Sequence, residues 1–292
     1  MNPLSHISFR PGAPSFWRRF AVLCLGAAQI ASAAAAAPRI FEWERGFGLQ
    51  VPGEASADMF LWFYEHNLFD AVQRGHNTKG TYKLDRRIDS AGTEAVVDSP
   101  LLHLTMRAVA NGAELTLRIT NRTDYEWPEI AGIIPCWSPG QVPGTNPSMP
   151  LPLNRNFADF WRNRTFFLTA GGLAPLSSRA IHFNAAFRAA VGQASDAGKF
   201  TFSNRWPTSV DNAVAGLIVR ESEDDRWVTG IAWERYVSVQ GHNPWSCMHA
   251  CVRVGPLKPG GSRTIRGRLY LFHGTKEDCL AQFLRDFPNP GG

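Results

Sequence analysis

The sequence contains none of the short motifs that identify a reaction by themselves. It has no glycine-rich phosphate loop ending in Lys-Ser or Lys-Thr, no Gly-x-Ser-x-Gly turn, no His-Glu-x-x-His helix and no paired Cys-x-x-Cys set. These absences argue against P-loop nucleotide hydrolases, serine hydrolases with that turn and zinc proteins of the common spacings. Any chemistry must come from clusters of suitable residue types.

Long apolar runs are also scarce. The clearest is residues 20–30 (FAVLCLGAAQI), which follows Arg10, Arg18 and Arg19 and precedes the small residues 31–33. This order predicts a signal peptide over residues 1–37 and a periplasmic or secreted mature chain. An uncleaved anchor is the alternative, but a spanning helix needs about 20 apolar residues. We expect no membrane partner after cleavage.

Basic runs are missing as well. The predicted signal peptide holds three arginines and no carboxylate, so its removal lowers the formal net charge from +5 to +2. The mature chain has no basic stretch that could follow a phosphate backbone. We therefore expect no nucleic-acid partner.

Cysteine is sparse, with Cys136, Cys247, Cys251 and Cys279 in the mature chain. An oxidising compartment would permit disulfides among them. In an extended strand the Cα atoms of Cys247 and Cys251 would be about 13 Å apart, too far for a bridge. A turn between them would allow one, so the pairing stays open.

Period-two patterns dominate what is present. Apolar residues alternate with polar ones over residues 102–108 and 115–120, and Asn111-Gly112 between them is a hairpin signal. Helical patterns are few: Thr275 and Asp278 resemble a capping box before an apolar run of helical spacing, and residues 178–191 are a second candidate. The patterns predict a mainly β protein. Residues 38–292 would form a single large antiparallel β-sandwich with few short helices and a C-terminal helix.

The densest cluster of reactive side chains lies between Trp233 and His249. If Trp233 belongs to the core, strand alternation would turn Glu234 and Tyr236 toward a cleft. A loop after them carries two imidazoles and sugar-binding residue types. We predict the catalytic residues Glu234, Tyr236, His242 and His249, with Asn243 and Trp245 binding substrate. The alternative is a buried strand followed by a polar loop with structural histidines. A zinc site from His242, His249 and Cys247 matches no standard spacing, so we expect no metal and no cofactor.

Arginines form a second group of candidates. Two or more guanidinium groups beside a tryptophan suit an acidic sugar, because each can bind a carboxylate through two hydrogen bonds. The predicted substrate-binding residues of this group are Arg107, Arg155, Trp161, Arg162, Arg164 and Arg268. A solvated basic surface explains them as well. A further acid–base cluster, Glu65-His66 with Asp70 and His76, follows an aromatic run.

Three segments resemble galactose-mutarotase-like supersandwich domains: residues 117–124 (LRITNRTD), residues 132–137 (GIIPCW), and residues 255–270, from GPLKPGGS to GRLY. The similarity spans roughly residues 100–274 and implies a supersandwich fold that processes carbohydrates. Mutarotases carry a catalytic histidine just before the proline of the middle motif. This chain has Ile134 there, which argues against simple aldose 1-epimerase activity, and Glu234 is a candidate for the family's glutamate base.

The expected function is that of a secreted carbohydrate-active protein. It would act on a sugar or oligosaccharide, including an anionic one, by acid–base chemistry of the epimerase, lyase or hydrolase type. One alternative is a non-catalytic carbohydrate-binding module of the same fold. Another is a structural envelope protein without a sugar site.

Overall fold

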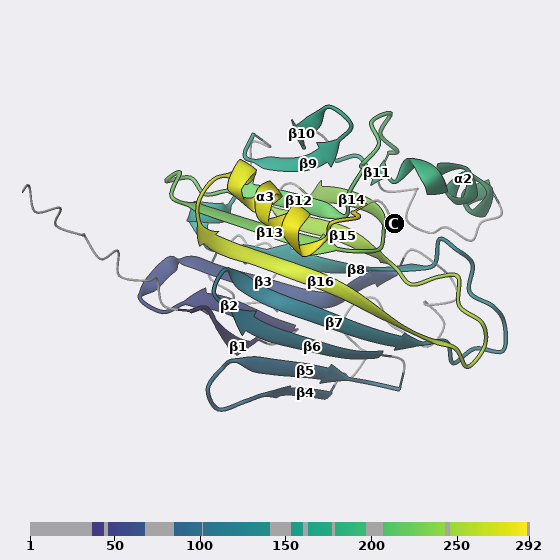
Figure 1. Ribbon diagram of the computed structural model, residues 1–292, viewed down its shortest axis with the longest axis horizontal. Coiled ribbons are helices and arrows are strands. Elements are labelled where there is room, and N and C mark those ends of the chain that lie inside the picture. The colour runs from purple at the N-terminus through teal and green to yellow at the C-terminus, as the bar shows by residue number, and fades with distance from the viewer. Residues whose placement is uncertain are drawn as a thin grey trace, which may run out of the picture. The chain divides into compact units, whose positions relative to one another are not determined.

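The computed structural model contains two antiparallel sheets (Figure 1). It describes residues 37–43, 46–67, 85–100, 102–140, 153–159, 163–176, 179–196, 207–242 and 246–290, all of which belong to one compact unit, Ala35–Gly292. Except for Ala37, the predicted signal peptide lies outside these residues. None of the helices described is long and apolar enough to cross a membrane.

The first sheet has seven strands. In spatial order they are β1 (Arg39–Trp43), β2 (Gly46–Val51), β3 (Glu54–Asn67), β8 (Gly132–Ser138), β15 (Cys247–Arg253), β14 (Tyr236–His242) and β11 (His182–Phe183). The central strands therefore come from distant parts of the chain, and β8 lies between β3 and β15.

The second sheet has nine strands. Their order is β10 (Gly172–Pro175), β9 (Thr165–Thr169), β12 (Leu217–Glu221), β13 (Trp227–Trp233), β16 (Ser262–His273), β7 (Gly112–Thr120), β6 (Leu102–Val109), β5 (Glu94–Asp98) and β4 (Asp85–Ile88). The predicted fold class, a large antiparallel β-sandwich, is confirmed.

The predicted hairpin forms β6 and β7. Leu104 pairs with Leu117 and Met106 with Leu115, and all four side chains are at most 1% exposed. Gly112 begins β7 with φ +132°, and a Cβ there would lie 2.0 Å from the carbonyl oxygen of Leu269. Only glycine fits this close approach of two backbones.

The apolar faces of the two sheets pack against each other. Trp137 of β8 shows the contact directly, since its indole Nε1 donates a hydrogen bond of 2.9 Å to Thr229 Oγ1 on β13 of the other sheet. Both side chains are fully buried. Residues that alternate with Trp137 therefore face away from the nine-stranded sheet.

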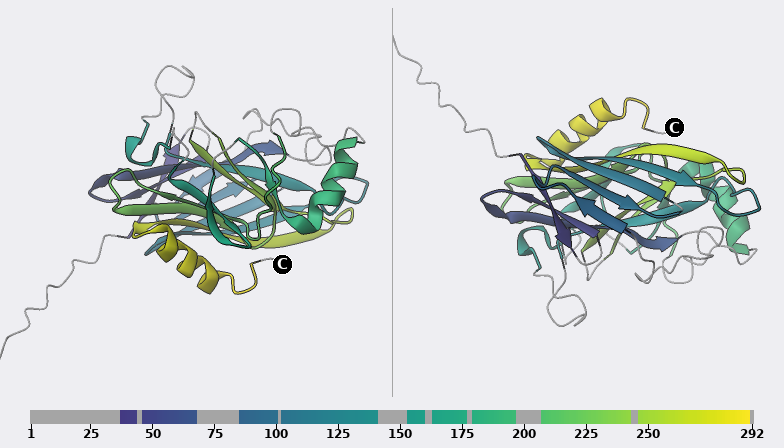
Figure 2. Two further views of the ribbon diagram at one scale, coloured as in Figure 1. Left: turned by 90° about the horizontal axis from the view of Figure 1, so that it is seen from above. Right: turned by 90° about the horizontal axis from the view of Figure 1, so that it is seen from below.

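The C-terminal helix α3 (Lys276–Asp286) is confirmed, with Thr275 and Asp278 forming the predicted capping box. Cys279 and Phe283 of α3 pack with Val219 and Tyr270 on the outer face of the nine-stranded sheet. Figure 2 shows α3 lying along that face. Burial of a phenylalanine side chain such as Phe283 contributes about 1.5–3 kcal/mol.

The second predicted helix, over residues 178–191, is correct only at its end. His182 and Phe183 instead pair with β14 as the short strand β11. Asn184 then accepts a hydrogen bond from the amide of Ala186 and caps the 3-10 turn η2 (Ala185–Phe187), which leads into α2 (Arg188–Asp196). The asparagine cap sets the start of the helical segment.

Candidate functional site

The outer face of the seven-stranded sheet, which points away from the nine-stranded sheet, carries the polar residues of interest. Val239 and Met248 belong to the main core, as does Trp137. Cys136, His249 and Gln240 alternate with these residues along β8, β15 and β14, so they lie on the outer face.

Four residues of this face lie side by side across four strands. Trp62 pairs with Cys136, and Gln240 pairs with His249. The register of β15 and β8, in which Met248 pairs with Trp137, places His249 opposite Cys136. Side chains at directly opposed positions have Cβ atoms about 5 Å apart. We call Trp62, Cys136, His249 and Gln240 the His249 row.

A second row runs parallel to it, two residues along each strand. Phe60 pairs with Ser138, and the register places Ser138 opposite Cys247. Cys247 in turn pairs with His242, the last residue of β14. We call Phe60, Ser138 and Cys247 the Cys247 row.

The β1–β3 end of the outer face is aromatic. Phe41, Trp43 and Trp62 pack around Phe60, with ring centroids 5.8 Å apart for Phe41–Phe60 and 5.6 Å for Trp43–Phe60. Gly48 of β2 makes room for them, since a Cβ there would overlap the ring of Phe41. Both rows therefore change from aromatic to polar or thiol side chains as they pass from β3 to β15.

Cys136, Cys247 and His249 converge at neighbouring positions of β8 and β15. One ligand atom from each, Sγ or a ring nitrogen, lies within 4.8 Å of the other two. Cys136 is 5% exposed and His249 is 2% exposed, whereas Cys247 and Trp62 are partly exposed and connect the site to solvent. The convergence brings two thiols and one imidazole into contact range.

Gln240 completes the polar end of the His249 row. Its side chain is 1% exposed, and neither atom of its amide has a hydrogen-bond partner among the described residues. A buried amide without partners costs free energy, so a ligand that supplies them would be favoured.

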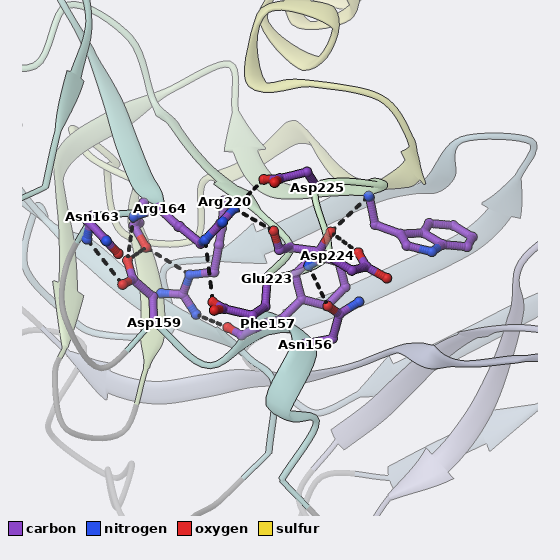
Figure 3. Close-up of polar contacts among 12 residues, drawn as sticks. Asn156, Phe157, Asp159, Asn163, Arg164, Arg220, Glu223, Asp224 and Asp225 are labelled. Atoms are coloured by element: carbon purple, nitrogen blue, oxygen red, sulfur yellow. Dashed lines mark hydrogen bonds and ion pairs between the residues drawn. The ribbon is translucent and has the colours of Figure 1, made fainter.

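The buried guanidinium of Arg220 on β12 contacts the backbone next to the site. Figure 3 shows Arg220 beside Phe157 and Asp159. Arg220 Nε donates to Thr165 Oγ1 at 2.8 Å, and its Nη1 donates to the carbonyl oxygens of Phe157 at 2.9 Å and Ser246 at 2.5 Å. Thr165 Oγ1 in turn donates to the Asp159 carboxylate at 2.6 Å. The network ties the residue before Cys247 to the other sheet.

The electrostatics of Arg220 involve the thiol site. Burial lowers the pKa of Arg220 to about 10, because the charged form loses its hydration, while negative charge on Asp159, Cys247 and Cys136 acts in the opposite direction. Arg220 therefore stays a cation at neutral pH. Its field favours negative charge at the two cysteines.

The predicted acid–base partners Glu234 and His249 are not brought together. Glu234 follows β13 in a turn, where its carboxylate accepts hydrogen bonds from Arg266 N at 2.7 Å and Nε at 2.9 Å. His249 pairs with Gln240, four residues along β14 from Tyr236, which corresponds to about 13 Å. Glu234 therefore binds Arg266 of β16 and does not contact the His249 row.

The expectation that Tyr236 faces a cleft is wrong. Tyr236 is 1% exposed in the main core, and its hydroxyl donates to the carbonyl oxygen of Ala213 at 3.0 Å. Burial raises its pKa. The reason is that β13 ends at Trp233 and the chain turns before β14, so alternation does not continue from Trp233 to Tyr236.

The loop residues predicted around this site are only partly described. The backbone of His242 pairs with Cys247, as given above, but its side chain lies outside the described set. Asn243 and Trp245 also lie outside it. In the Glu65–His76 cluster, the backbone of His66 pairs with Ile134, and Asp70 and His76 lie outside the described residues.

Arg107 and Arg268 lie on the other sheet. Glu94, Arg107, Glu114 and Arg268 form a row of alternating charge across β5, β6, β7 and β16. Glu114 forms ion pairs with both arginines, and Arg268 is also 3.4 Å from Asp286 of α3. These two arginines therefore bind carboxylates of the protein itself, on a different sheet from His249.

Of the remaining arginine candidates, Arg164 belongs to the network of Figure 3. Arg164 Nη1 donates to the carbonyl oxygen of Ser222 at 2.7 Å and to the Asp225 carboxylate at 2.6 Å, so it holds the turn between β12 and β13. Arg155, on the 3-10 turn η1 (Arg155–Phe157), is exposed. Trp161 and Arg162 lie outside the described residues.

Comparison with known proteins gives only remote similarities. No family model and no curated protein matches the chain. A solved structure of a putative aldose 1-epimerase from Escherichia coli K12 is similar over 83% of this chain and 82% of its own, with 12% identity and a TM-score of 0.35. A galactose mutarotase-like protein from Lactobacillus casei ATCC 334 covers 80% of this chain and 99% of its own, with 9% identity and a TM-score of 0.39.

A third similar structure is a polysaccharide lyase, matched over 84% of this chain and 34% of its own, with 10% identity and a TM-score of 0.32. Similar solved structures thus include the family that the sequence resembles, and the predicted resemblance is confirmed. With TM-scores below 0.4, activity must be argued from this chain's own residues.

Proposed function

We propose that this protein is an exported carbohydrate-active protein whose sugar site lies at the His249 row. The observation that carries the proposal is the composition of that row, which passes from an indole at Trp62 to an imidazole at His249 and an amide at Gln240. Aromatic faces cover the C–H side of a sugar ring, while amide and imidazole groups bind its hydroxyls.

More specifically, we propose that the protein is an enzyme of the epimerase, lyase or hydrolase type, with the reacting sugar atoms at His249. Export follows from the predicted signal peptide. His249 is the one predicted catalytic residue whose described side chain lies in the row, since Glu234 and Tyr236 are held elsewhere by Arg266 and Ala213. The reaction therefore differs from one that uses Glu234 and His249 as a pair.

The test compares His249→Ala with Glu234→Gln in a turnover screen on mono- and oligosaccharides. His249→Ala should lower turnover by about 10²–10⁴-fold, the usual contribution of a side chain that transfers a proton or stabilises the reacting atoms. Glu234→Gln should leave turnover nearly unchanged. Circular dichroism of both variants would establish that the fold is kept. Full turnover in folded His249→Ala would reject the site.

A non-catalytic carbohydrate-binding module is the second candidate. The observation that favours it is the aromatic cluster of Phe41, Trp43, Phe60 and Trp62 beside the row, because such surfaces stack on sugar rings without any reaction. Binding of an oligosaccharide that is weakened by Trp62→Ala, with no turnover of any sugar by the unaltered protein, would support the module over the enzyme.

A further inference from the structure

Cys136, Cys247 and His249 have the chemical composition of a transition-metal site. Two thiolates and one imidazole suit zinc and other thiophilic ions, and catalytic zinc sites with this ligand set keep a fourth position open. The three ligand atoms lie within 4.8 Å of one another. Two thiolates on one zinc ion, each at about 2.3 Å, have sulfur atoms within that range.

The strand register distinguishes a metal site from a disulfide. Because His249 is opposite Cys136, Cys247 is diagonal to Cys136 in the same ladder. Diagonal neighbours across strands are about 7–8 Å apart, whereas disulfides need Cα atoms within about 6.8 Å. A bridging ion spans this geometry without backbone movement. Cys247 and Cys251 cannot bridge either, since both lie in the extended strand β15.

The surrounding charges fit an occupied site. Metal binding requires both cysteines as thiolates, which adds two negative charges to a buried region. Arg220 supplies a buried positive charge that interacts with both cysteines, and Asp159 balances it. Two thiolates with a divalent ion, together with Arg220 and Asp159, give a site without net charge. Such a balance limits the cost of burying charge.

The backbone before Cys247 is held in place. Ser246 has φ +54°, a left-handed conformation that is unusual for a residue other than glycine. The hydrogen bond from Arg220 to its carbonyl oxygen fixes this peptide. Strain of this kind is commonly kept where a side chain must be positioned, and here it sets the start of β15 at Cys247.

The amide of Gln240 lies next to the fourth, open coordination position that an ion on Cys136, Cys247 and His249 would have. Gln240 is opposite His249 in the ladder and buried, and its amide has no partner among the residues that the structure describes. An amide in this position can bind a water on the ion or orient the imidazole, as polar neighbours of metal ligands do.

We propose that Cys136, Cys247 and His249 bind one thiophilic transition-metal ion, for which zinc is the test case, with Gln240 beside its open coordination position. The site departs from the expectation of no metal. It does not depend on the proposed sugar chemistry, although it occupies the same place on the outer face.

The experiment uses the full mature chain, reduced with a reagent that contains no thiol and titrated with Co²⁺ in place of Zn²⁺. One equivalent should bind and produce the near-ultraviolet absorption of a thiolate–cobalt bond, and zinc should displace it. Cys136→Ser and Cys247→Ser should each lower the affinity by more than about 100-fold. Cys251→Ala, on the same strand, is the matched control and should bind as the unaltered chain does.

Absence of the absorption band, or a band of equal strength in both serine variants, would overturn the proposal. If the serine variants do not fold, thermal unfolding of the unaltered chain decides. Its Tm should rise with added zinc relative to chelator, and no rise would also overturn it. No sugar takes part in these measurements. Cobalt binding by a chain that binds no sugar would support this site and reject the proposed function.

Discussion

Arg220 of β12 donates a hydrogen bond of 2.5 Å to the carbonyl oxygen of Ser246 and so joins the nine-stranded sheet to the first residue before β15. Ser246 precedes Cys247, and the register of β15 places His249 opposite Cys136. The position of the thiol and imidazole site therefore depends on a guanidinium from the opposite sheet. This dependence can be measured as stability.

Replacement of Arg220 by glutamine should lower the free energy of unfolding by about 3–5 kcal/mol, because three hydrogen bonds from a buried charged donor are lost and their acceptors stay buried. Urea denaturation followed by fluorescence would measure it. The matched control is Arg107→Gln, an exposed arginine whose loss should leave stability nearly unchanged. A loss below 1 kcal/mol for Arg220→Gln would contradict the assigned role.

The pH dependence of stability should report on His182. Burial lowers the pKa of His182 from 6.5, and a weaker opposing effect comes from its hydrogen bond to the Asp211 carbonyl oxygen. A lowered folded-state pKa means that the unfolded chain binds the proton more tightly. The contribution of neutral His182 is therefore complete above about pH 6.5 and declines as the pH falls from there toward the lowered folded pKa.

The ring of His182 lies 3.9 Å from that of Phe167, so His182→Phe keeps an aromatic side chain against it and removes the titration. Unfolding free energies measured between pH 7.5 and pH 5 should fall less steeply for His182→Phe than for the unaltered protein. Equal slopes would show that protonation of His182 is not linked to unfolding.

The sequence predicted paired strands better than it predicted turns. The alternation of Leu104, Met106, Leu115 and Leu117 predicted the β6–β7 hairpin, because residues close in the chain pair directly. The capping pair before α3 was equally local. The prediction that Glu234 faces a cleft was wrong because it depended on how far the strand continues after Trp233. A two-residue turn after Trp233 interrupts the strand, and no periodicity in the sequence shows where a new strand begins.

The site itself depends on pairings that the sequence does not contain. Cys136 and Trp62 come from strands far from β15 in the chain, and only the register of β3, β8 and β15 makes them neighbours of His249. Arg220 lies within a nearly continuous apolar strand, which is the one signal that could have indicated it. A charged residue in such a strand needs buried partners.

Processing of the N-terminus stays a prediction from the sequence. Protein purified from the native envelope should begin between residues 34 and 38, because the small residues that follow the apolar run suit signal peptidase. Intact-mass analysis of the soluble protein would measure the start. The retention of Met1 on mature soluble protein would reject export by this route.

The predicted preference for an anionic sugar rests on Arg155. This residue is exposed on η1, whose capping residue Asn154 donates a hydrogen bond to the carbonyl oxygen of Asp58 on β3, so η1 lies beside the strand that carries Phe60 and Trp62. Arg164 and Arg268, by contrast, are engaged with carboxylates of the protein. We predict that an acidic sugar stacked on the aromatic end of the outer face places its carboxylate near the Arg155 side chain.

Calorimetry with a uronate oligosaccharide and its neutral counterpart would measure this preference at low and high salt. The uronate should bind more tightly at low salt, and the difference should shrink as salt screens the charges. Arg155→Gln should reduce the difference by about 0.5–1 kcal/mol, the usual scale for an exposed ion pair. Arg107→Gln, which removes an exposed arginine from the other sheet, should leave it unchanged. Equal affinities for both sugars at low salt would contradict the predicted preference.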